Sequence, residues 1–212
     1  MKKSLFEIYG KYCGSENNLY YPLGRDEYNR LSNTPEGRVE MKITSGTDKG
    51  TSHNYIPIYE RYMKKLSSIN LLEIGIAEGY SIRMWNEYFD DSNIYGCDHN
   101  LSQLHFSLNN VFEIDSTNKD QARNILNDIK FDYIIDDGDH RASTQIKTLD
   151  CMWPYLKDDG IYFIEDIEND HSLSQIIEYV GNFDNSVKKH HVYDGRQETG
   201  QWDEIMVIIF KK

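Results

Sequence analysis

Acidic residues and one histidine follow two apolar runs in the second half of the sequence. Asp136-Asp137-Gly138-Asp139-His140 comes after one run, and Glu165-Asp166 comes after the next. If the runs are neighbouring parallel strands, both loops lie at the same edge of the sheet. Unpaired carboxylates that meet in one cleft repel each other, and a hard divalent cation such as Mg²⁺ or Mn²⁺ relieves that repulsion. We therefore predict a metal site at Asp137, Glu165 and Asp166.

His140 stands three residues after Asp137, where it can take a proton from a hydroxyl held at the metal. A metal ion acidifies a weakly nucleophilic hydroxyl and fixes it for attack. The pattern therefore predicts catalytic roles for His140 and Asp137. Simpler interpretations stay open, because Asp139 would also serve as a cap for the following helix and a lone histidine in a loop is more often a surface residue.

Short apolar runs alternate with helix-like stretches from residue 69 onward. Strands are expected over 69–74, 92–98, 111–115, 131–136 and 161–165, and helices over 80–89, 118–130 and 141–157. This alternation predicts a parallel sheet covered on both faces. The end of the chain differs, because strand-like segments 187–193 and 204–210 are joined by a polar loop without a helix. That arrangement predicts a terminal antiparallel hairpin.

Small residues occupy the turn Gly75-Ile76-Ala77-Glu78-Gly79, between a strand and a helix. Such a turn lets the backbone approach a ligand closely, although any tight turn of this kind has a similar composition. Asp98 ends the second strand, where a carboxylate accepts ribose hydroxyls, and Asp115 with Ser116 ends the third, where an acid meets adenine. These features predict cofactor binding at Gly75, Ala77, Gly79, Asp98, Asp115, Ser116 and Asp136. Asp98 suits NAD equally well.

Taken together, these segments resemble the metal-dependent sugar O-methyltransferases of macrolide biosynthesis, of the macrocin and mycinamicin type, over residues 43–210. The resemblance rests on five segments: Gly46-Thr47-Asp48-Lys49-Gly50 with His53 and Tyr55, the turn over 72–79, residues 136–140, Glu165-Asp166, and Asp203-Glu204. It implies an α/β fold with a Rossmann-like, seven-stranded class I methyltransferase sheet, mostly parallel with a C-terminal antiparallel hairpin. Nucleotide dehydrogenases usually lack that hairpin. The resemblance also implies two cofactors, S-adenosylmethionine (SAM) and Mg²⁺ or Mn²⁺.

The resemblance further implies where residues of the first conserved segment lie. Thr47, Asp48 and Lys49 are expected near the cofactor and the mouth of the substrate site, and Lys49 or His53 is expected to meet a carboxylate or a hydroxyl. Glu73 is expected to meet the amino-acid half of SAM. The simpler interpretation is a loop before a helix over 54–67, with Ser52 as its N-cap.

The expected function is SAM-dependent, Mg²⁺-assisted methyl transfer to a sugar hydroxyl of a glycoside, a nucleotide-sugar or a polysaccharide precursor. The macrolide enzymes carry a larger N-terminal region, whereas about 45 residues precede the motif here, so the acceptor stays open. A phenolic or catechol acceptor is one alternative, because the same carboxylates would serve it. An NAD-dependent oxidoreductase and a cofactor-binding scaffold without turnover are two others.

The composition sets the remaining expectations. The 212 residues suggest a methyltransferase domain over 46–212, preceded by an N-terminal cap or oligomerisation segment over 1–45, and a homodimer or larger assembly. A net charge of −12 with dispersed lysines and arginines argues against nucleic acid as a partner. The sequence shows neither a secretory signal nor a membrane-length apolar run, so we expect a cytoplasmic protein without membrane insertion. Three widely spaced cysteines predict reduced, structural thiols.

Overall fold

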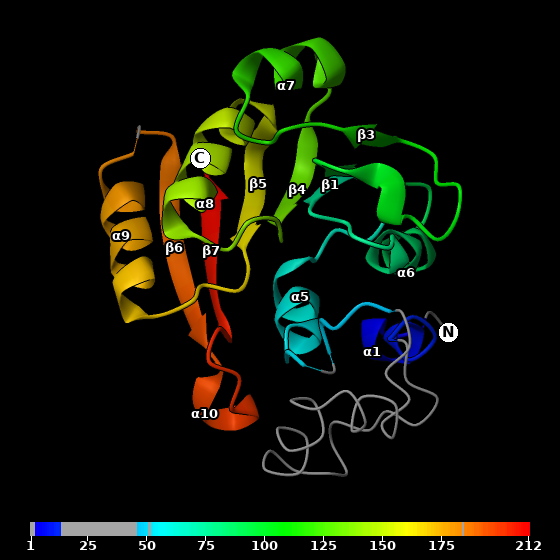
Figure 1. Cartoon of the computed structure of the whole chain (residues 1–212), viewed down its shortest axis with the longest axis horizontal. Coiled ribbons are helices and arrows are strands. Elements are labelled where there is room, and N and C mark those ends of the chain that lie inside the picture. The colour runs from blue at the N-terminus through cyan, green and yellow to red at the C-terminus, as the bar shows by residue number, and fades with distance from the viewer. Residues whose placement is uncertain (1–2, 14–45, 51, 184) are drawn as a thin grey trace.

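Seven strands form one mixed sheet in the order β3-β2-β1-β4-β5-β7-β6, within the residues that this computed structural model describes, 3–13, 46–50, 52–183 and 185–212 (Figure 1). Neighbouring strands from β3 to β5 are parallel, and β7 is antiparallel to both β5 and β6. This topology confirms the predicted α/β class and the class I methyltransferase sheet. The strands are β1 (Asn70–Ile74), β2 (Asn93–Asp98), β3 (Val111–Glu113), β4 (Phe131–Asp136), β5 (Leu156–Ile164), β6 (Val187–Asp194) and β7 (Ile205–Lys211).

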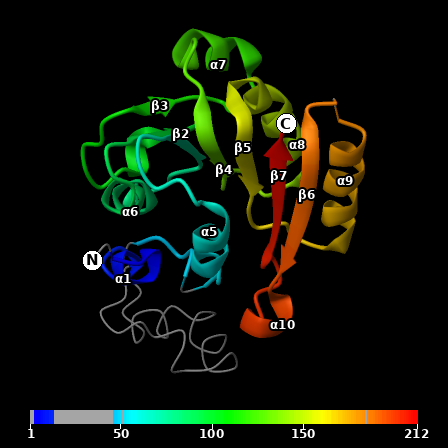
Figure 2. The same ribbon diagram turned by 180° about the vertical axis from the view of Figure 1, so that it is seen from behind.

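Helices cover both faces of the sheet (Figures 1 and 2). One face carries α1 (Leu5–Tyr9), α5 (Ile56–Tyr62) and α6 (Tyr80–Tyr88), whose apolar residues share one core cluster. The other carries α7 (Lys119–Leu126), α8 (Ala142–Met152) and α9 (Asp170–Gly181), which share a second. The remaining helices in the described part of the chain are α10 (Arg196–Thr199) and the 3₁₀ turns Leu101–Gln103 and Trp153–Tyr155.

Apolar residues of the inner strands contribute to both hydrophobic cores, one on each face of the sheet. In β4, Tyr133 and Ile135 belong to the first cluster, whereas Ile134 between them belongs to the second. Successive side chains of a strand point to opposite faces, so a strand covered on both sides must be apolar at nearly every position. The acidic loops begin where β4 and β5 end, at the carboxyl edge of the parallel strands.

Two predicted helices are shorter in the structure. The helix expected over 141–157 ends at Met152 and gives way to a 3₁₀ turn, because Pro154 has no N–H to donate to a preceding turn. The strand β5 then begins at Leu156, earlier than predicted, and an irregular register absorbs the polar residues that follow. The helix expected over 118–130 spans only Lys119–Leu126, with Asn118 as its N-cap.

Three further predictions need correction. The helix expected over 54–67 spans Ile56–Tyr62, and its N-cap is Tyr55 rather than Ser52. The loop of the terminal hairpin, predicted to lack a helix, contains α10. Helix α9 was not among the predicted elements, although Asn169 caps it in the usual way by accepting a hydrogen bond from the backbone N–H of Ser172.

The N-terminal segment predicted as a cap is described only in part. Helix α1 packs its buried residues Leu5, Ile8 and Tyr9 into the same core cluster as α5 and α6. Residues 14–45 lie outside the described part of the chain. Within the described residues, no helix is long and apolar enough to cross a membrane. The three cysteines are buried, and none of them forms a disulfide.

Candidate active site

The turn after β1 lies directly against the end of β4. The backbone N–H of Asp137 donates to the carbonyl of Ile74, and Gly75 has a φ of +79°. A Cβ on Gly75 would lie 2.0 Å from the carbonyl oxygen of Asp137, so no other residue fits there without displacing the backbone. Gly79 starts α6 in a left-handed conformation, and its α-carbon is packed against Leu104 and Leu108. The first glycine therefore brings the turn and the acidic loop together.

Asp98 holds the turn from the neighbouring strand. Its Oδ2 accepts hydrogen bonds from the backbone N–H groups of Ile76 at 3.0 Å and Ala77 at 3.1 Å. Its Oδ1 accepts from the backbone N–H of Asn100 and lies 3.0 Å from Nδ1 of His99. The carboxylate predicted to meet a ribose thus also fixes the shape of the turn.

The end of β3 contributes a second ordered acid. Oδ1 of Asp115 accepts from the backbone N–H and the hydroxyl of Thr117, at 2.9 and 2.7 Å. These hydrogen bonds hold the pKa of the Asp115 carboxyl below its usual value. Ser116 shares a 3.1 Å hydrogen bond with the hydroxyl of Thr148 in α8.

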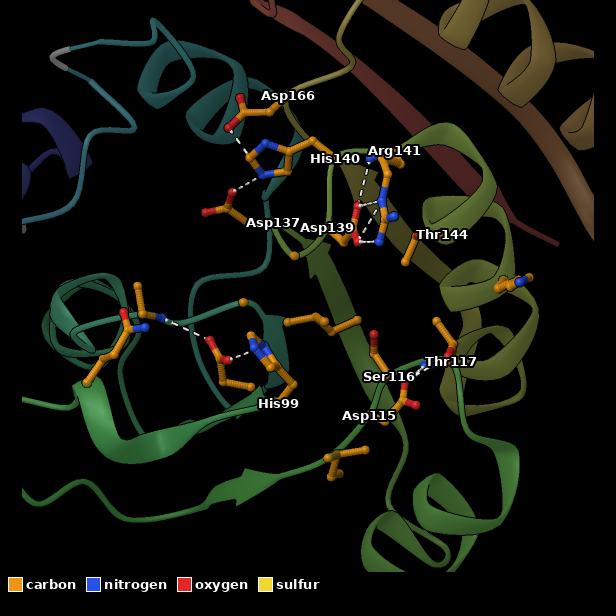
Figure 3. Close-up of a pocket in the computed structure, with 18 of the residues that line it drawn as sticks. His99, Asp115, Ser116, Thr117, Asp137, Asp139, His140, Arg141, Thr144 and Asp166 are labelled. Carbon is orange, nitrogen blue, oxygen red and sulfur yellow. Dashed lines mark hydrogen bonds and ion pairs between the residues drawn. The ribbon is translucent and has the colours of Figure 1, made fainter.

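A cavity of about 710 Å³ opens at this edge of the sheet (Figure 3). Its lining combines the glycine turn, the acids that end β2 and β3, and the loop after β4. Predicted site residues in the lining are Gly75, Ala77, Asp98, Asp115, Ser116, Asp137, His140 and Asp166. Predicted residues that do not line it are Thr47, Lys49, Glu73, Gly79, Asp136 and Glu165.

His140 lies between two carboxylates at one end of the cavity (Figure 3). Its Nε2 is 3.5 Å from Oδ1 of Asp137 and 3.7 Å from Oδ2 of Asp166. Burial alone would lower the pKa of the imidazole, but the two carboxylates outweigh it and raise the pKa to about 9. Ligand atoms of Asp137, His140 and Asp166 lie within 4.8 Å of one another, which is close enough to hold one metal ion.

Asp139 takes no part in this group. Its carboxylate faces away, toward the guanidinium of Arg141, with which it forms several hydrogen bonds (Figure 3). The bonds from Arg141 hold the pKa of Asp139 down at about 2. Arg141, not Asp139, occupies the N-cap position of α8, so the capping role considered for Asp139 is wrong.

Lys49 meets carboxylates, as predicted, but it does not line the cavity. Its ammonium is buried beneath the site, 2.5 Å from Oδ2 of Asp137, 2.6 Å from Oε2 of Glu165 and 3.2 Å from Oε1 of Glu73. Glu73 is itself fully buried and accepts a hydrogen bond from the indole N–H of Trp85. The charges of Lys49 and Glu73 are paired with each other in the interior of the protein. Neither residue lines the cavity.

Glu165 is also buried and does not line the cavity. Its Oε2 accepts from Lys49, whereas its Oε1 is buried without a hydrogen-bond partner. Burial raises the pKa of this carboxyl, against the effect of the nearby ammonium. Among the described residues, the group with metal-ligand spacing thus holds His140 in the place that the sequence assigned to Glu165.

Thr47 and Asp136 are buried as well. Thr47 ties its segment to the N-terminal helix, because its carbonyl accepts from the hydroxyl of Tyr9 and its N–H donates to the carbonyl of Tyr12. Asp136 is 1% exposed, lies 3.4 Å from the hydroxyl of Tyr162, and has its pKa raised by burial to about 7. Neither Thr47 nor Asp136 lines the cavity.

A second layer of polar residues was only partly foreseen. The hydroxyl of Tyr55 donates to Oδ1 of Asp166 at 2.8 Å, and its ring stacks on His53. His53 and the backbone N–H of Asn54 contact the two oxygens of Glu204, at 3.0 and 2.7 Å. Burial lowers the pKa of His53, but Glu204 and Asp166 outweigh this and raise it to about 10. His53 does meet a carboxylate, and the Asp203-Glu204 pair was the signal for its partner.

The chain is similar to known methyltransferases. Residues 72–167 match a family model described as a methyltransferase domain. The chain is 26% identical over 148 residues to 8-demethyl-8-alpha-L-rhamnosyl tetracenomycin-C 2'-O-methyltransferase of Streptomyces olivaceus, covering 62% of this chain and 38% of that protein. It is 28% identical over 132 residues to mycinamicin VI 2''-O-methyltransferase of Micromonospora griseorubida, covering 56% of this chain and 32% of that protein. The chain thus spans well under half the length of these two relatives.

A solved structure shows the same fold over most of the chain. It is the MycE methyltransferase from the mycinamycin biosynthetic pathway, in complex with Mg and SAH (S-adenosylhomocysteine). The TM-score is 0.60 at 21% identity, over 88% of this chain and 54% of that one. The curated relatives support the predicted resemblance to sugar O-methyltransferases, and the structural match supports the predicted sheet.

Proposed function

Starting from the methyltransferase domain over residues 72–167, we propose that the chain is an O-methyltransferase that moves a methyl group from SAM to a sugar hydroxyl with the help of a divalent cation. One observation carries this proposal. His140 stands between Asp137 and Asp166 at the end of a cavity that Gly75, Asp98 and Asp115 also line. The proposed base, the two carboxylates proposed for the metal and the edge proposed for the cofactor thus line the same cavity.

SAM is proposed to occupy the cavity along the ends of β1, β2 and β3. The turn at Gly75 and Ala77 offers close backbone approach, and Asp98 and Asp115 offer carboxylates for the ribose and the adenine. Gly79, Ser116 and Asp136 would help to form this edge of the sheet. When bound, the sulfonium of SAM supplies the methyl group. The chain's own task is to orient the acceptor and remove its proton.

The residues present fit a hard divalent cation. Asp137 and Asp166 offer oxygen donors on the cavity side, and Glu165 carries a buried oxygen, Oε1, without any hydrogen-bond partner. Oxygen donors of this kind are those that Mg²⁺ and Mn²⁺ prefer. We propose Asp137, Glu165 and Asp166 as the residues that hold the cation, which would supply acidification of the acceptor hydroxyl when bound.

His140 is proposed to take the proton of the acceptor hydroxyl at Nε2. This nitrogen faces the two carboxylates that would hold the cation, so it lies beside the hydroxyl that the cation would fix. Asp137 and Asp166 also orient the ring before the acceptor arrives. The sugar nature of the acceptor is supported by the relatives, whose names specify rhamnosyl and mycinamicin substrates.

Several broader expectations remain proposals. We propose a catalytic domain over 46–212 to which α1 adds part of the core, and a homodimer or larger assembly. A glycoside, a nucleotide-sugar or a polysaccharide precursor is the proposed partner. We also propose a cytoplasmic location.

Calorimetric titration of the purified protein with S-adenosylhomocysteine and with NADH tests the cofactor. We expect the first to bind at micromolar concentration and the second not to bind. Asp137→Ala should leave this binding within about threefold of wild type but abolish Mg²⁺-dependent turnover. Tight NADH binding, or full turnover by Asp137→Ala, would overturn the proposal. Turnover on phenols but not on glycosides would replace the sugar acceptor by the phenolic one.

A further inference from the structure

The ammonium of Lys49 is fully enclosed in the protein, together with carboxylates from three different strand ends. Glu73 comes from β1, Asp137 follows β4, and Glu165 follows β5. Lys49 and Glu165 are each 1% exposed and Glu73 is not exposed at all. A buried ammonium is tolerated only when it is paired, and here it is paired three times. The coulombic attraction of these carboxylates holds the pKa of Lys49 well above its usual value, in spite of its burial.

Two of these three partners are residues that we propose to hold the divalent cation. Asp137 shares its carboxylate between Lys49 through Oδ2 and His140 through Oδ1. Glu165 gives Oε2 to Lys49 and keeps Oε1 without a hydrogen-bond partner. The positive charge of Lys49 thus already neutralises part of the charge of Asp137 and Glu165, on the side of these carboxylates that faces the interior.

We infer that Lys49 is a built-in counter-cation that holds Asp137 and Glu165 in place before the divalent cation binds, and that weakens the binding of that cation. This inference rests on the proposed metal site. Two positive charges that share the same carboxylates repel each other strongly in a buried site, where screening is weak. This repulsion should outweigh the ordering effect of Lys49, because its ammonium lies 2.5 Å from Oδ2 of Asp137 and 2.6 Å from Oε2 of Glu165.

Lys49 also reduces the repulsion among these acids. Glu73, Asp137 and Glu165 all lie within 3.2 Å of its ammonium, and each ionised carboxylate repels the others. A variant without the ammonium should therefore gain more stability from a divalent cation than the wild-type protein gains.

The test measures Mn²⁺ affinity by electron paramagnetic resonance of free Mn²⁺ at pH 8, without SAM or acceptor. We expect Lys49→Met to bind Mn²⁺ at least tenfold more tightly than wild type, because the competing charge is gone. Lys49→Arg keeps the charge and should stay within about threefold of wild type. Lys65→Met, which removes another lysine bonded to an aspartate, Asp132, is the matched control and should change nothing. Equal or weaker Mn²⁺ binding by Lys49→Met would overturn the inference.

Thermal unfolding in EDTA and in excess MnCl2 covers the case in which Lys49→Met folds poorly. We expect Mn²⁺ to raise the Tm of Lys49→Met by more than it raises that of wild type, and a variant that folds only with Mn²⁺ counts as support. A variant that stays unfolded in both buffers shows a purely structural lysine and overturns the inference. Absence of Mn²⁺ binding by the wild-type protein would instead contradict the metal in the proposed function.

Discussion

The hydroxyl of Tyr55 donates a 2.8 Å hydrogen bond to Oδ1 of Asp166, whose other oxygen lies 3.7 Å from Nε2 of His140. The tyrosine precedes α5, far in sequence from the loop after β5, yet it fixes the orientation of a carboxylate at the proposed metal site. A partner of this kind commonly determines how well a carboxylate holds a metal. Several consequences can be measured.

Tyr55→Phe should keep the fold but disturb the metal site. The ring retains its stacking on His53 and its edge contact with Tyr193, while Asp166 loses its hydrogen-bond donor. We expect Mn²⁺ affinity and turnover to fall about 10- to 100-fold, with the affinity for S-adenosylhomocysteine unchanged. Tyr179→Phe, which removes a 2.6 Å hydrogen bond to Asp150 outside the site, is the control. Unchanged Mn²⁺ binding in Tyr55→Phe would show that Asp166 needs no such support.

His140 should titrate well above an ordinary histidine in metal-free protein. Its pKa of about 9 lies above the usual 6.5, so the stabilisation by protonated His140 is complete below pH 6.5 and is lost as the pH rises toward 9. Proton NMR of the imidazole in EDTA checks this, with His140→Gln to assign the signal. Mg²⁺ should lower the pKa, because it neutralises the carboxylates of Asp137 and Asp166.

His191 supplies an internal comparison for that titration. Burial and the nearby charges of Lys189 and Arg61 lower the pKa of its imidazole. The two histidines should therefore titrate on opposite sides of pH 6.5 in the same sample. A His140 signal that titrates at or below pH 6.5 without metal would contradict the geometry of the carboxylate pair.

Gly75→Ala should destabilise the protein and impair cofactor binding together. The added methyl meets the carbonyl of Asp137, and φ at this position is +79°. We expect the free energy of unfolding to fall by roughly 2–4 kcal/mol, measured by urea denaturation. Gly181→Ala at the end of α9 adds a methyl with nothing within 4 Å and should leave stability unchanged or raised by up to about 1 kcal/mol. Equal stability of the two variants would refute the close approach.

Asp98→Ala should weaken the binding of S-adenosylhomocysteine. The variant loses a carboxylate proposed for the ribose and also releases the backbone N–H groups of Ile76 and Ala77. Hydrogen bonds to a charged group are worth about 1.5–3 kcal/mol, which corresponds to a loss of roughly 10- to 100-fold in affinity. Calorimetry against Asp120→Ala, whose carboxylate is 85% exposed on α7, provides the comparison. A loss of less than threefold would remove Asp98 from the cofactor site.

The sequence predicts the sheet well because the apolar runs are short and clearly bounded. The fourth strand has the predicted limits, 131–136, and parallel neighbours place the acids after β4 and β5 at one edge. Helix limits were predicted less well, since Pro154 ends α8 and the polar residues after it belong to β5. Local patterns do not show where a break in register absorbs extra residues.

In the site, too, features that follow from the order of the strands were predicted better than contacts between residues distant in sequence. Asp137, His140 and Asp166 come together because their positions follow from strand topology. Lys49 and Glu73 were expected at the cofactor, but their mutual ion pair in the interior depends on side-chain reach across contacts distant in sequence. The spacing of residues along the sequence does not show which side chains from distant segments will contact each other.

The central claim is Mg²⁺-dependent methyl transfer to a sugar hydroxyl. Mass spectrometry of a panel of glycosides and nucleotide-sugars, incubated with the protein and SAM with Mg²⁺ or with EDTA, tests it most directly. We predict that at least one sugar gains the mass of one methyl group with Mg²⁺ and none does in EDTA, and that His140→Ala lowers the rate about 10²- to 10⁴-fold. Methylation of a sugar that proceeds equally well in EDTA, or no methylated sugar in any mixture, would contradict the account.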